Sequence, residues 1–281
     1  MHRLPPGTLQ AGRGEPIVLF HGILGTPLMW RQVLPPLATQ YRGIALPTLG
    51  HHSGNPCSER PVQIRHLVDD AERSLDALGL DDAHLVGNSL GGWIALELAR
   101  RGRARTVCAF SPAGMWKDGN DDGARSKLRA TLKLARFSRP TLPFSARFAA
   151  VRRLALRDNA VYGERTSRAD LLALSDAALN CSAAEDLLAT QERFEPLAVA
   201  CPIDIVWAAK DRIFPVDPFV DNARELLPSA RHYLLDDVGH VPMFDNPELV
   251  ANTILQQLEK VRLDSLRPRD EVPGQADGRS P

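Results

Sequence analysis

Residues Ala83–Gly92 read A-H-L-V-G-N-S-L-G-G, and the helix-like Trp93–Arg101 follows them directly. The apolar run at the start, Ala83–Asn88, is typical of a buried strand. The Gly-x-Ser-x-Gly pattern then predicts a tight turn from strand to helix, where side chains on the neighbours of the serine would not fit. Such a turn holds the Ser89 hydroxyl at the edge of a sheet, next to the N–H group of Leu90. We therefore expect Ser89 to be a nucleophile.

A serine hydroxyl attacks a carbonyl only when a base accepts its proton, and that base needs a carboxylate partner. Downstream, the apolar run I-V-W-A-A-K-D ends at Asp211, and L-L-D-D-V-G-H ends at His240. The order Ser89, Asp211, His240 is the one expected when the nucleophile follows a strand of an α/β sheet. Asp217 and Asp204 are the alternative acids, although Asp204 lies inside a predicted strand.

The stretch His21–Gly25 (H-G-I-L-G) follows the first strong apolar run, Pro16–His21. Its position predicts that the N–H group of Ile23 pairs with that of Leu90 to form an oxyanion hole. Two such donors stabilise the negative oxygen of a tetrahedral intermediate, each by on the order of 3–4 kcal/mol.

Further short apolar runs suit strands of a buried parallel sheet. They are Ile44–Pro47, Thr106–Phe110 and Ile203–Ala208. Val62–Leu78 has apolar residues three and four positions apart, and Asn246-Pro247-Glu248 is typical of a helix start. Strands that alternate with helices predict an α/β fold with a mostly parallel sheet flanked by helices.

The alternation lapses between about Met115 and Pro202, where three segments (124–136, 143–156 and 170–189) look helical. We interpret this stretch as a helical insertion. The predicted organisation is a core domain of residues 1–115 and 200–263, a helical cap of residues 116–199 and a disordered tail of residues 264–281. The tail is rich in Pro, Gly and Asp, with hardly any residue to bury.

The composition argues against a nucleic-acid-binding, membrane-spanning or disulfide-rich protein. The 281 residues include 34 basic and 34 acidic ones, so no overall field favours a nucleic acid. No apolar run is long enough to span a membrane, and no secretory leader begins the chain. The four cysteines form no metal-binding or disulfide pattern, which favours a reducing cytoplasm. We expect no metal ion and no cofactor.

Four motifs together identify the chain as resembling the α/β-hydrolase fold superfamily, in its serine-nucleophile branch: V-L-F-H-G, G-N-S-L-G-G, W-A-A-K-D and V-G-H-V-P. They are spread from about Pro16 to Val261. The resemblance implies a helical cap between the sixth and seventh family strands. Two features depart from the family pattern. The N-terminal hairpin is cut short or absent, and the loop Leu46–Gly54 lacks the usual Asp and Arg.

Haloalkane dehalogenases and epoxide hydrolases of this fold carry Asp at the elbow, whereas this chain carries Ser89. The expected function is a cofactor-free serine hydrolase that cleaves a carboxylic ester or thioester through an acyl-enzyme. One alternative is a hydrolase of carbon–carbon bonds in vinylogous diketones, since similar G-N-S elbows occur in that family. The other is a ligand-binding receptor on a hydrolase scaffold.

The expected substrate contacts are Leu24, Trp116, Val241 and Met243. Core packing is the alternative for Met243 and its neighbour Phe244. His51 and His52 are adjacent and would point to opposite sides of an extended chain, so a loop near the active-site rim is favoured over a metal site.

Residues Ala124–Arg168 carry twelve basic and two acidic side chains, a net charge of +10. A solvated helix surface explains this charge most simply. The sharper interpretation is a basic cap that attracts an anionic or carrier-protein-linked acyl substrate.

Overall fold

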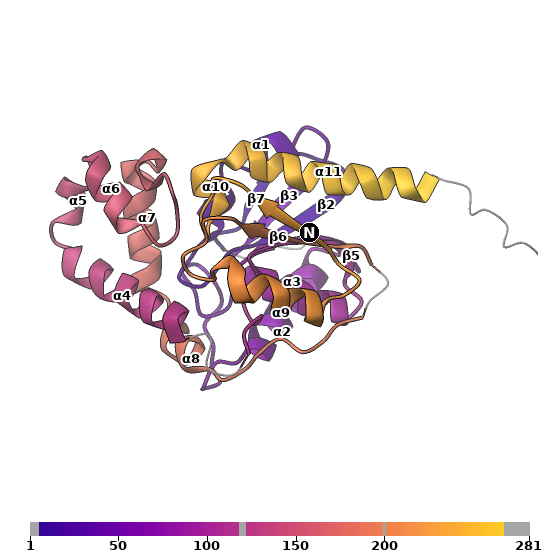
Figure 1. Cartoon of the computed structure of the whole chain (residues 1–281), viewed down its shortest axis with the longest axis horizontal. Coiled ribbons are helices and arrows are strands. Elements are labelled where there is room, and N and C mark those ends of the chain that lie inside the picture. Colours follow the sequence, from indigo (N-terminus) through magenta and orange to yellow (C-terminus); the bar gives the residue numbers. More distant parts are fainter. Residues whose placement is uncertain (1–5, 118–121, 199–200, 267–281) are drawn as a thin grey trace, which may run out of the picture.

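The computed structural model describes residues 6–117, 122–198 and 201–266 (Figure 1). Its centre is a seven-stranded sheet in the order β1-β3-β2-β4-β5-β6-β7. Every neighbouring pair is parallel except β1, which runs antiparallel to β3. The strands are β1 (Leu9–Ala11), β2 (Pro16–Phe20), β3 (Arg42–Leu46), β4 (Ala83–Asn88), β5 (Ala104–Phe110), β6 (Ile203–Ala208) and β7 (Arg231–Leu235).

Helices cover both faces of the sheet (Figure 1). Because side chains alternate along a strand, Ile17 and Leu19 of β2 face one side and Val18 and Phe20 the other. The first side packs against α1 (Leu34–Leu37) and α11 (Pro247–Leu266); the second packs against α2 (Ile64–Ala77), α3 (Leu90–Arg100) and α9 (Val216–Leu226). The short elements η1 (Pro27–Trp30) and α10 (Pro242–Asp245) complete this part of the chain.

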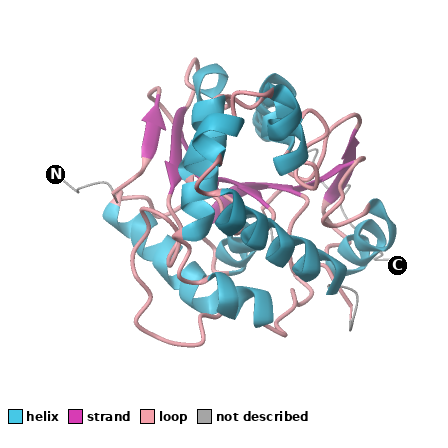
Figure 2. Ribbon diagram, turned by 90° about the vertical axis from the view of Figure 1, so that its left-hand side faces the viewer, coloured by secondary structure: helices cyan, strands magenta, loops and turns pink. Residues whose placement is uncertain are grey.

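The helical insertion lies between β5 and β6, and its helices face the viewer in Figure 2. It consists of α4 (Asp122–Ser138), α5 (Leu142–Ser145), α6 (Ala149–Ala155), η2 (Gly163–Arg165), α7 (Arg168–Leu179) and α8 (Ala184–Ala189). Helix α4 contacts α7 and α8, and α10 contacts η2. The predicted α/β fold with a mostly parallel sheet and a helical cap is thereby confirmed.

Two segments predicted as single helices are each broken into two. The segment 143–156 contains α5 and α6, and the guanidinium of Arg152 donates to the carbonyl oxygens of Ala146 and Arg147 at the break. The segment 170–189 contains α7 and α8, separated where the Ala183 N–H donates to the Gly50 carbonyl. In both cases a hydrogen bond outside the helical pattern satisfies a group that a continuous helix would pair internally.

The structure adds detail to what the sequence predicted for the two ends of the chain. The N-terminal hairpin is cut short, because β1 has three residues and pairs only with β3. Helix α11 extends to Leu266, beyond Asp264 where the tail was expected to start, and the rest of that predicted tail lies outside the described residues. At its start, the side-chain oxygen of Asn246 accepts from the Leu249 N–H at 2.9 Å, as predicted for a helix cap.

Within the described residues, every helix is too short or too polar to cross a membrane. The four cysteines are all described and all are free thiols.

Candidate active site

Ser89 occupies the turn between β4 and α3, with φ 55° and ψ −119°. A side chain other than glycine is rarely found at positive φ, so the surrounding structure must hold this conformation. Gly87 and Gly91 make it possible. A Cβ on Gly87 would lie 2.1 Å from the Gly91 oxygen, and one on Gly91 would lie 2.2 Å from the Phe20 oxygen. The elbow predicted from the sequence is therefore built by close packing of backbone on backbone.

Asp211 and His240 meet after β6 and β7. Asp211 Oδ2 accepts from His240 Nδ1 at 2.7 Å, and Oδ1 accepts from the N–H groups of Ile213 at 2.8 Å and Phe214 at 2.7 Å. The Asp211 side chain is fully buried and that of His240 is 4% exposed. Three donors compensate the burial of the carboxylate. With Nδ1 donating, neutral His240 carries its lone pair on Nε2.

The two expected oxyanion donors come from neighbouring turns. Leu90 begins α3, where the first N–H groups of a helix have no partner within the helix. Ile23 follows Gly22, and a Cβ on Gly22 would lie 3.3 Å from the Ser89 Cβ, so this turn lies against the elbow. The Gly25 N–H donates to the Gly22 carbonyl at 3.0 Å, and Leu24 has φ 62°. This turn therefore lies beside Ser89, and the pairing of the Ile23 and Leu90 N–H groups stays a prediction.

Behind the turn lies a pair of buried histidines that the sequence did not reveal. The rings of His21 and His51 are 5.3 Å apart and meet edge to face. His21 accepts from the Thr48 N–H at Nε2, so its Nδ1 carries the hydrogen and donates to the Gly22 carbonyl at 2.9 Å. Burial lowers the pKa of His21 to about 3 and that of His51 to about 4. Both rings are neutral and support the turn Gly22–Gly25.

His51 is therefore a packed residue rather than part of an exposed active-site rim. Its Nδ1 lies 3.0 Å from the Leu49 carbonyl, and its Nε2 is buried without a partner among the described residues.

Ser89 and His240 line one open cavity of about 850 Å³. Residues of the cap line it, and so do Leu24 and Val241, whose expected contact with substrate stays a prediction. No Asp, Glu, Lys or Arg is among its lining residues. Within the described residues, no hydrogen bond joins the Ser89 hydroxyl to His240, an arrangement common in unliganded sites.

A second apolar cavity reaches Ser89 from the side of α3. Trp116 belongs to its wall, next to Trp93, whose ring centroid lies 5.5 Å away. The indole N–H of Trp116 donates to the Glu192 carbonyl at 3.2 Å. Ser89 and Ile23 line both cavities, so the elbow lies at their junction.

Met243 does not line either of these cavities. Its side chain is 2% exposed and packs in the core cluster that contains Val206 and Val250, beside a neighbouring cavity. Phe244 lines this neighbouring cavity too, and it also lines the cavity of Ser89. Helix α10 begins at Pro242, and successive residues of a helix point about 100° apart, so only Phe244 of the two reaches the cavity of Ser89.

The alternative acids and the other histidine lie elsewhere. Asp204 is buried in β6 and accepts from Arg231 at 2.6 Å. Asp217 is exposed at the start of α9. His232 lies on β7, where its Nε2 is 3.2 Å from the Leu227 carbonyl. None of the three is hydrogen-bonded to His240 among the described residues.

Two residues that the sequence analysis missed hold the backbone around His240. The Asn88 amide donates to the His240 carbonyl at 2.9 Å and to the Phe110 carbonyl at 3.2 Å. The Asp245 carboxylate, 3% exposed, accepts from the Gly239 N–H at 2.7 Å. The G-N-S tripeptide could have pointed to Asn88, whereas no local pattern marks Asp245.

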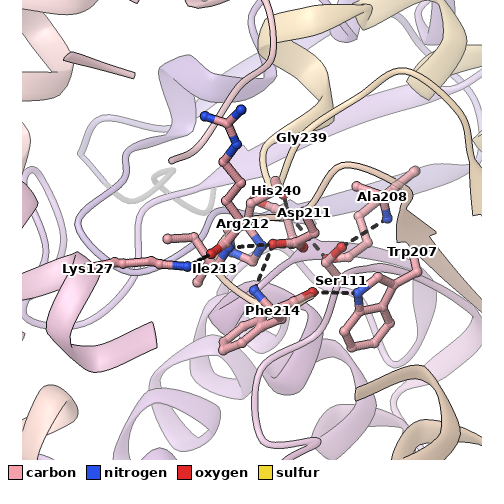
Figure 3. Close-up of polar contacts among 12 residues, drawn as sticks. Ser111, Lys127, Trp207, Ala208, Asp211, Arg212, Ile213, Phe214, Gly239 and His240 are labelled. Atoms are coloured by element: carbon pink, nitrogen blue, oxygen red, sulfur yellow. Dashed lines mark hydrogen bonds and ion pairs between the residues drawn. The ribbon is translucent and has the colours of Figure 1, made fainter. Parts of the chain in front are cut away.

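The cap is tied to both loops that carry the candidate acid and base. On the acid side, Lys127 of α4 donates to the Arg212 carbonyl (Figure 3), and the Arg212 side chain donates to the Arg157 carbonyl at 3.1 Å. On the histidine side, the Val241 N–H donates to the Asn159 carbonyl at 2.8 Å. The positions of Asp211 and His240 therefore depend on the cap.

Among the described residues, no group of three or more His, Cys, Asp and Glu side chains has the geometry to hold a metal ion. The expectation of a cofactor-free site stays a prediction.

Comparison with known proteins places these features in a family. A profile described as the alpha/beta hydrolase family matches residues 17–253. The chain is 34% identical over 209 residues to epoxide hydrolase EphH of Mycobacterium tuberculosis, which covers 69% of this chain and 94% of that protein. It is 40% identical over 114 residues to 2-hydroxymuconate semialdehyde hydrolase of Pseudomonas sp. strain CF600, covering 37% of this chain and 39% of that protein.

A solved structure also resembles this chain over most of its length. The thermophilic esterase of Thermogutta terrifontis superposes with a TM-score of 0.69 at 21% identity, covering 90% of this chain and 93% of the esterase.

Proposed function

Since the chain belongs to the alpha/beta hydrolase family, we propose that it cleaves a carboxylic ester or thioester through an acyl-enzyme on Ser89. One observation carries the proposal. The ring of His240, held at Nδ1 by Asp211 at 2.7 Å, lines the same cavity as the strained Ser89 elbow. This combination supplies a nucleophile and an oriented base.

The proposed reaction proceeds in two stages. His240 Nε2 accepts the hydroxyl proton of Ser89 while the Ser89 Oγ bonds to the carbonyl carbon of the substrate. The carbonyl oxygen of the substrate then becomes negative. The N–H groups of Ile23 and Leu90 donate to that oxygen. When the intermediate collapses, the bond to the leaving alcohol or thiol breaks and His240 returns the proton to it. Water then attacks the acyl-enzyme with the same proton transfers and releases the acid.

The cavities favour a substrate with an apolar acyl group. The larger cavity has no Asp, Glu, Lys or Arg in its wall, so an acyl chain there would be uncharged and would bind through the burial of apolar surface. The second cavity would take the leaving group, because it reaches Ser89 from the other side.

Epoxide hydrolysis, the activity named for the relative of M. tuberculosis, fits a serine elbow poorly. A carboxylate that opens an epoxide forms an ester, which water can hydrolyse. The Ser89 oxygen would form an ether, which has no carbonyl for water to attack. The covalent intermediate would therefore be a dead end.

Carbon–carbon bond hydrolysis is the second candidate. The local similarity to 2-hydroxymuconate semialdehyde hydrolase supports it, and Arg125 lines the second cavity next to Ser89. A guanidinium there could pair with the carboxylate of a dienoate substrate.

Three measurements on the purified chain test the proposal. A fluorophosphonate reagent should label Ser89, as located by mass spectrometry. p-Nitrophenyl esters and thioesters of graded chain length should be hydrolysed, and a ring-cleavage dienoate should not. Ser175 lines the same cavity, so Ser175→Ala is the matched control for Ser89→Ala. Cleavage of the dienoate alone would favour the second candidate. Absence of both labelling and turnover would favour a receptor.

A further inference from the structure

The outer end of the cap exposes large apolar side chains. We call residues 133–154, which comprise the end of α4 with α5 and α6, the cap tip (Figure 1). The tip contributes five of the nine exposed large apolar side chains of the described residues: Phe137 (91% exposed), Phe144 (61%), Leu154 (56%), Phe148 (48%) and Leu134 (45%). Monomeric proteins rarely leave such side chains together in water unless a partner covers them.

These side chains are not needed for the packing of the cap. The cap's own cluster consists of Leu142, Ala146, Leu156, Ala160 and Leu171. Helix α6 buries none of its residues. Folding alone therefore gives no reason for phenylalanines at positions 137, 144 and 148.

Cations are interleaved with the apolar side chains. The tip exposes Lys133, Arg136, Arg139, Arg147 and Arg153. The Arg147 guanidinium lies over the rings of both Phe144 and Phe148, at 3.7 and 4.6 Å from their centroids. No Asp or Glu occurs between Ala124 and Arg157, so the tip has no acid of its own. Two acids from outside the tip form ion pairs with it: Glu185 lies 3.9 Å from Arg136, and Glu164 lies 3.8 Å from Arg153.

We propose that the cap tip docks on the surface of a bilayer that contains anionic lipids. Phenylalanine and leucine would enter the boundary between headgroups and acyl chains, while arginine and lysine would bind the phosphates. An acidic protein matches only the cations. It would also need a pocket for each protruding phenylalanine, whereas a bilayer accommodates all of them without a preformed shape.

The tip also forms part of the wall of the large cavity. Leu134, Ser138 and Leu142 belong to the tip and line the cavity that reaches Ser89. Docking would therefore bring this part of the cavity wall close to the membrane, where apolar substrates accumulate. Binding itself needs no chemistry at Ser89, so this proposal stands apart from the proposed activity.

Co-sedimentation with vesicles tests the proposal. The full chain is mixed with phosphatidylcholine vesicles, with or without roughly one-third phosphatidylglycerol. We expect binding to the anionic vesicles at about 0.1 M salt and at least tenfold weaker binding to the neutral ones. Phe137→Ser/Phe144→Ser and Arg139→Glu/Arg147→Glu should each lower the binding at least about tenfold. Ser89→Ala should bind like the wild type, which separates docking from catalysis.

Two double variants at other sites are the matched controls. Leu263→Ser/Leu266→Ser removes equally exposed apolar side chains from α11, and Arg13→Glu/Lys260→Glu reverses two exposed cations away from the cap. Both should bind like the wild type. Equal binding by the tip variants and the wild type, or no binding to anionic vesicles, would overturn the proposal. Loss of binding in the arginine variant but not in the phenylalanine variant would also overturn it, because it would show adsorption through charge alone, without insertion of the apolar side chains.

Discussion

The buried carboxylate of Asp245 accepts a hydrogen bond of 2.7 Å from the backbone N–H of Gly239, the residue before His240. The same carboxylate accepts from the N–H groups of Tyr162 at 2.7 Å and Val161 at 3.1 Å, both in the cap. One side chain thus fixes the loop of the candidate base and the cap segment next to it. Asp245 is a positioning residue, because it acts through the backbone that carries His240.

Asp245→Asn should lower kcat/KM for an ester about 10- to 100-fold. The side-chain amide nitrogen of Asn is a donor, so it cannot accept the backbone N–H groups that a carboxylate oxygen of Asp245 accepts. The loop that carries His240 would therefore shift. Steady-state kinetics and thermal unfolding measure the effect. Asp237→Asn is the control, since Asp237 is exposed and pairs with Lys210. A structural role alone would lower the Tm and leave kcat/KM of the folded fraction unchanged.

Asp211→Asn should lower kcat by about 10⁴-fold while the fold is kept. The amide can donate to His240 Nδ1 and thereby stabilise the tautomer that has its hydrogen on Nε2, which cannot accept the serine proton. Asp217→Asn changes an exposed residue and should leave kcat within about twofold. If the two variants behaved in the reverse way, Asp217 would be the acid.

Gly91→Ala should destabilise the protein by about 3 kcal/mol or prevent folding. The new Cβ would lie 2.2 Å from the Phe20 oxygen, and both groups belong to the backbone, so neither can turn aside. Gly123→Ala is the control, because a Cβ there meets nothing within 4 Å and alanine favours the helix. Urea unfolding followed by circular dichroism compares the two.

Acid should destabilise the fold through His21 and His51. Their pKa values, about 3 and about 4 in the folded chain, lie below the ordinary 6.5. Above pH 6.5 both histidines are neutral in the folded and in the unfolded chain, so they do not lower the free energy of unfolding. As the pH falls from 6.5 toward 4, the unfolded chain binds protons that the folded chain excludes, so the free energy of unfolding decreases.

The variant His51→Asn isolates half of this effect. Its amide can replace the Nδ1 donor to the Leu49 carbonyl and does not titrate. The slope of unfolding free energy against pH near pH 5 should be about 1.4 kcal/mol per pH unit smaller than in the wild type. Urea unfolding at several pH values provides the slopes. An unchanged slope would show that His51 already binds its proton in the folded chain.

Local signals explain what the sequence could predict. β4 and β6 have the predicted limits, since Ala83–Asn88 and Ile203–Ala208 are apolar runs buried on both faces. Ser89 and Asp211 each follow such a run, whereas His240 follows the more exposed strand β7. All three come after parallel strands, so their placement at one edge of the sheet needed only the parallel topology. The N-cap at Asn246 was equally local.

Contacts between distant segments explain which features could not be predicted from the sequence. His21 supports its turn through Thr48 and His51, which belong to the next connection of the chain. Asp245 acts on Gly239 and on the cap, and nothing in its own neighbours marks this role. Met243 and Phe244 are both apolar, and only the direction of α10 decides which one faces the cavity.

The ties between the cap and the two loops have a consequence for access to the site. A hinged opening of the whole cap would break the Val241–Asn159 and Arg212–Arg157 hydrogen bonds, on either side of the Asp211–His240 pair. An open chain would thus lose contacts on both loops. Under the proposed mechanism, Ser89 would then have an aligned base only while the cap is closed, and its hydroxyl would be unreactive toward molecules that reach an open site.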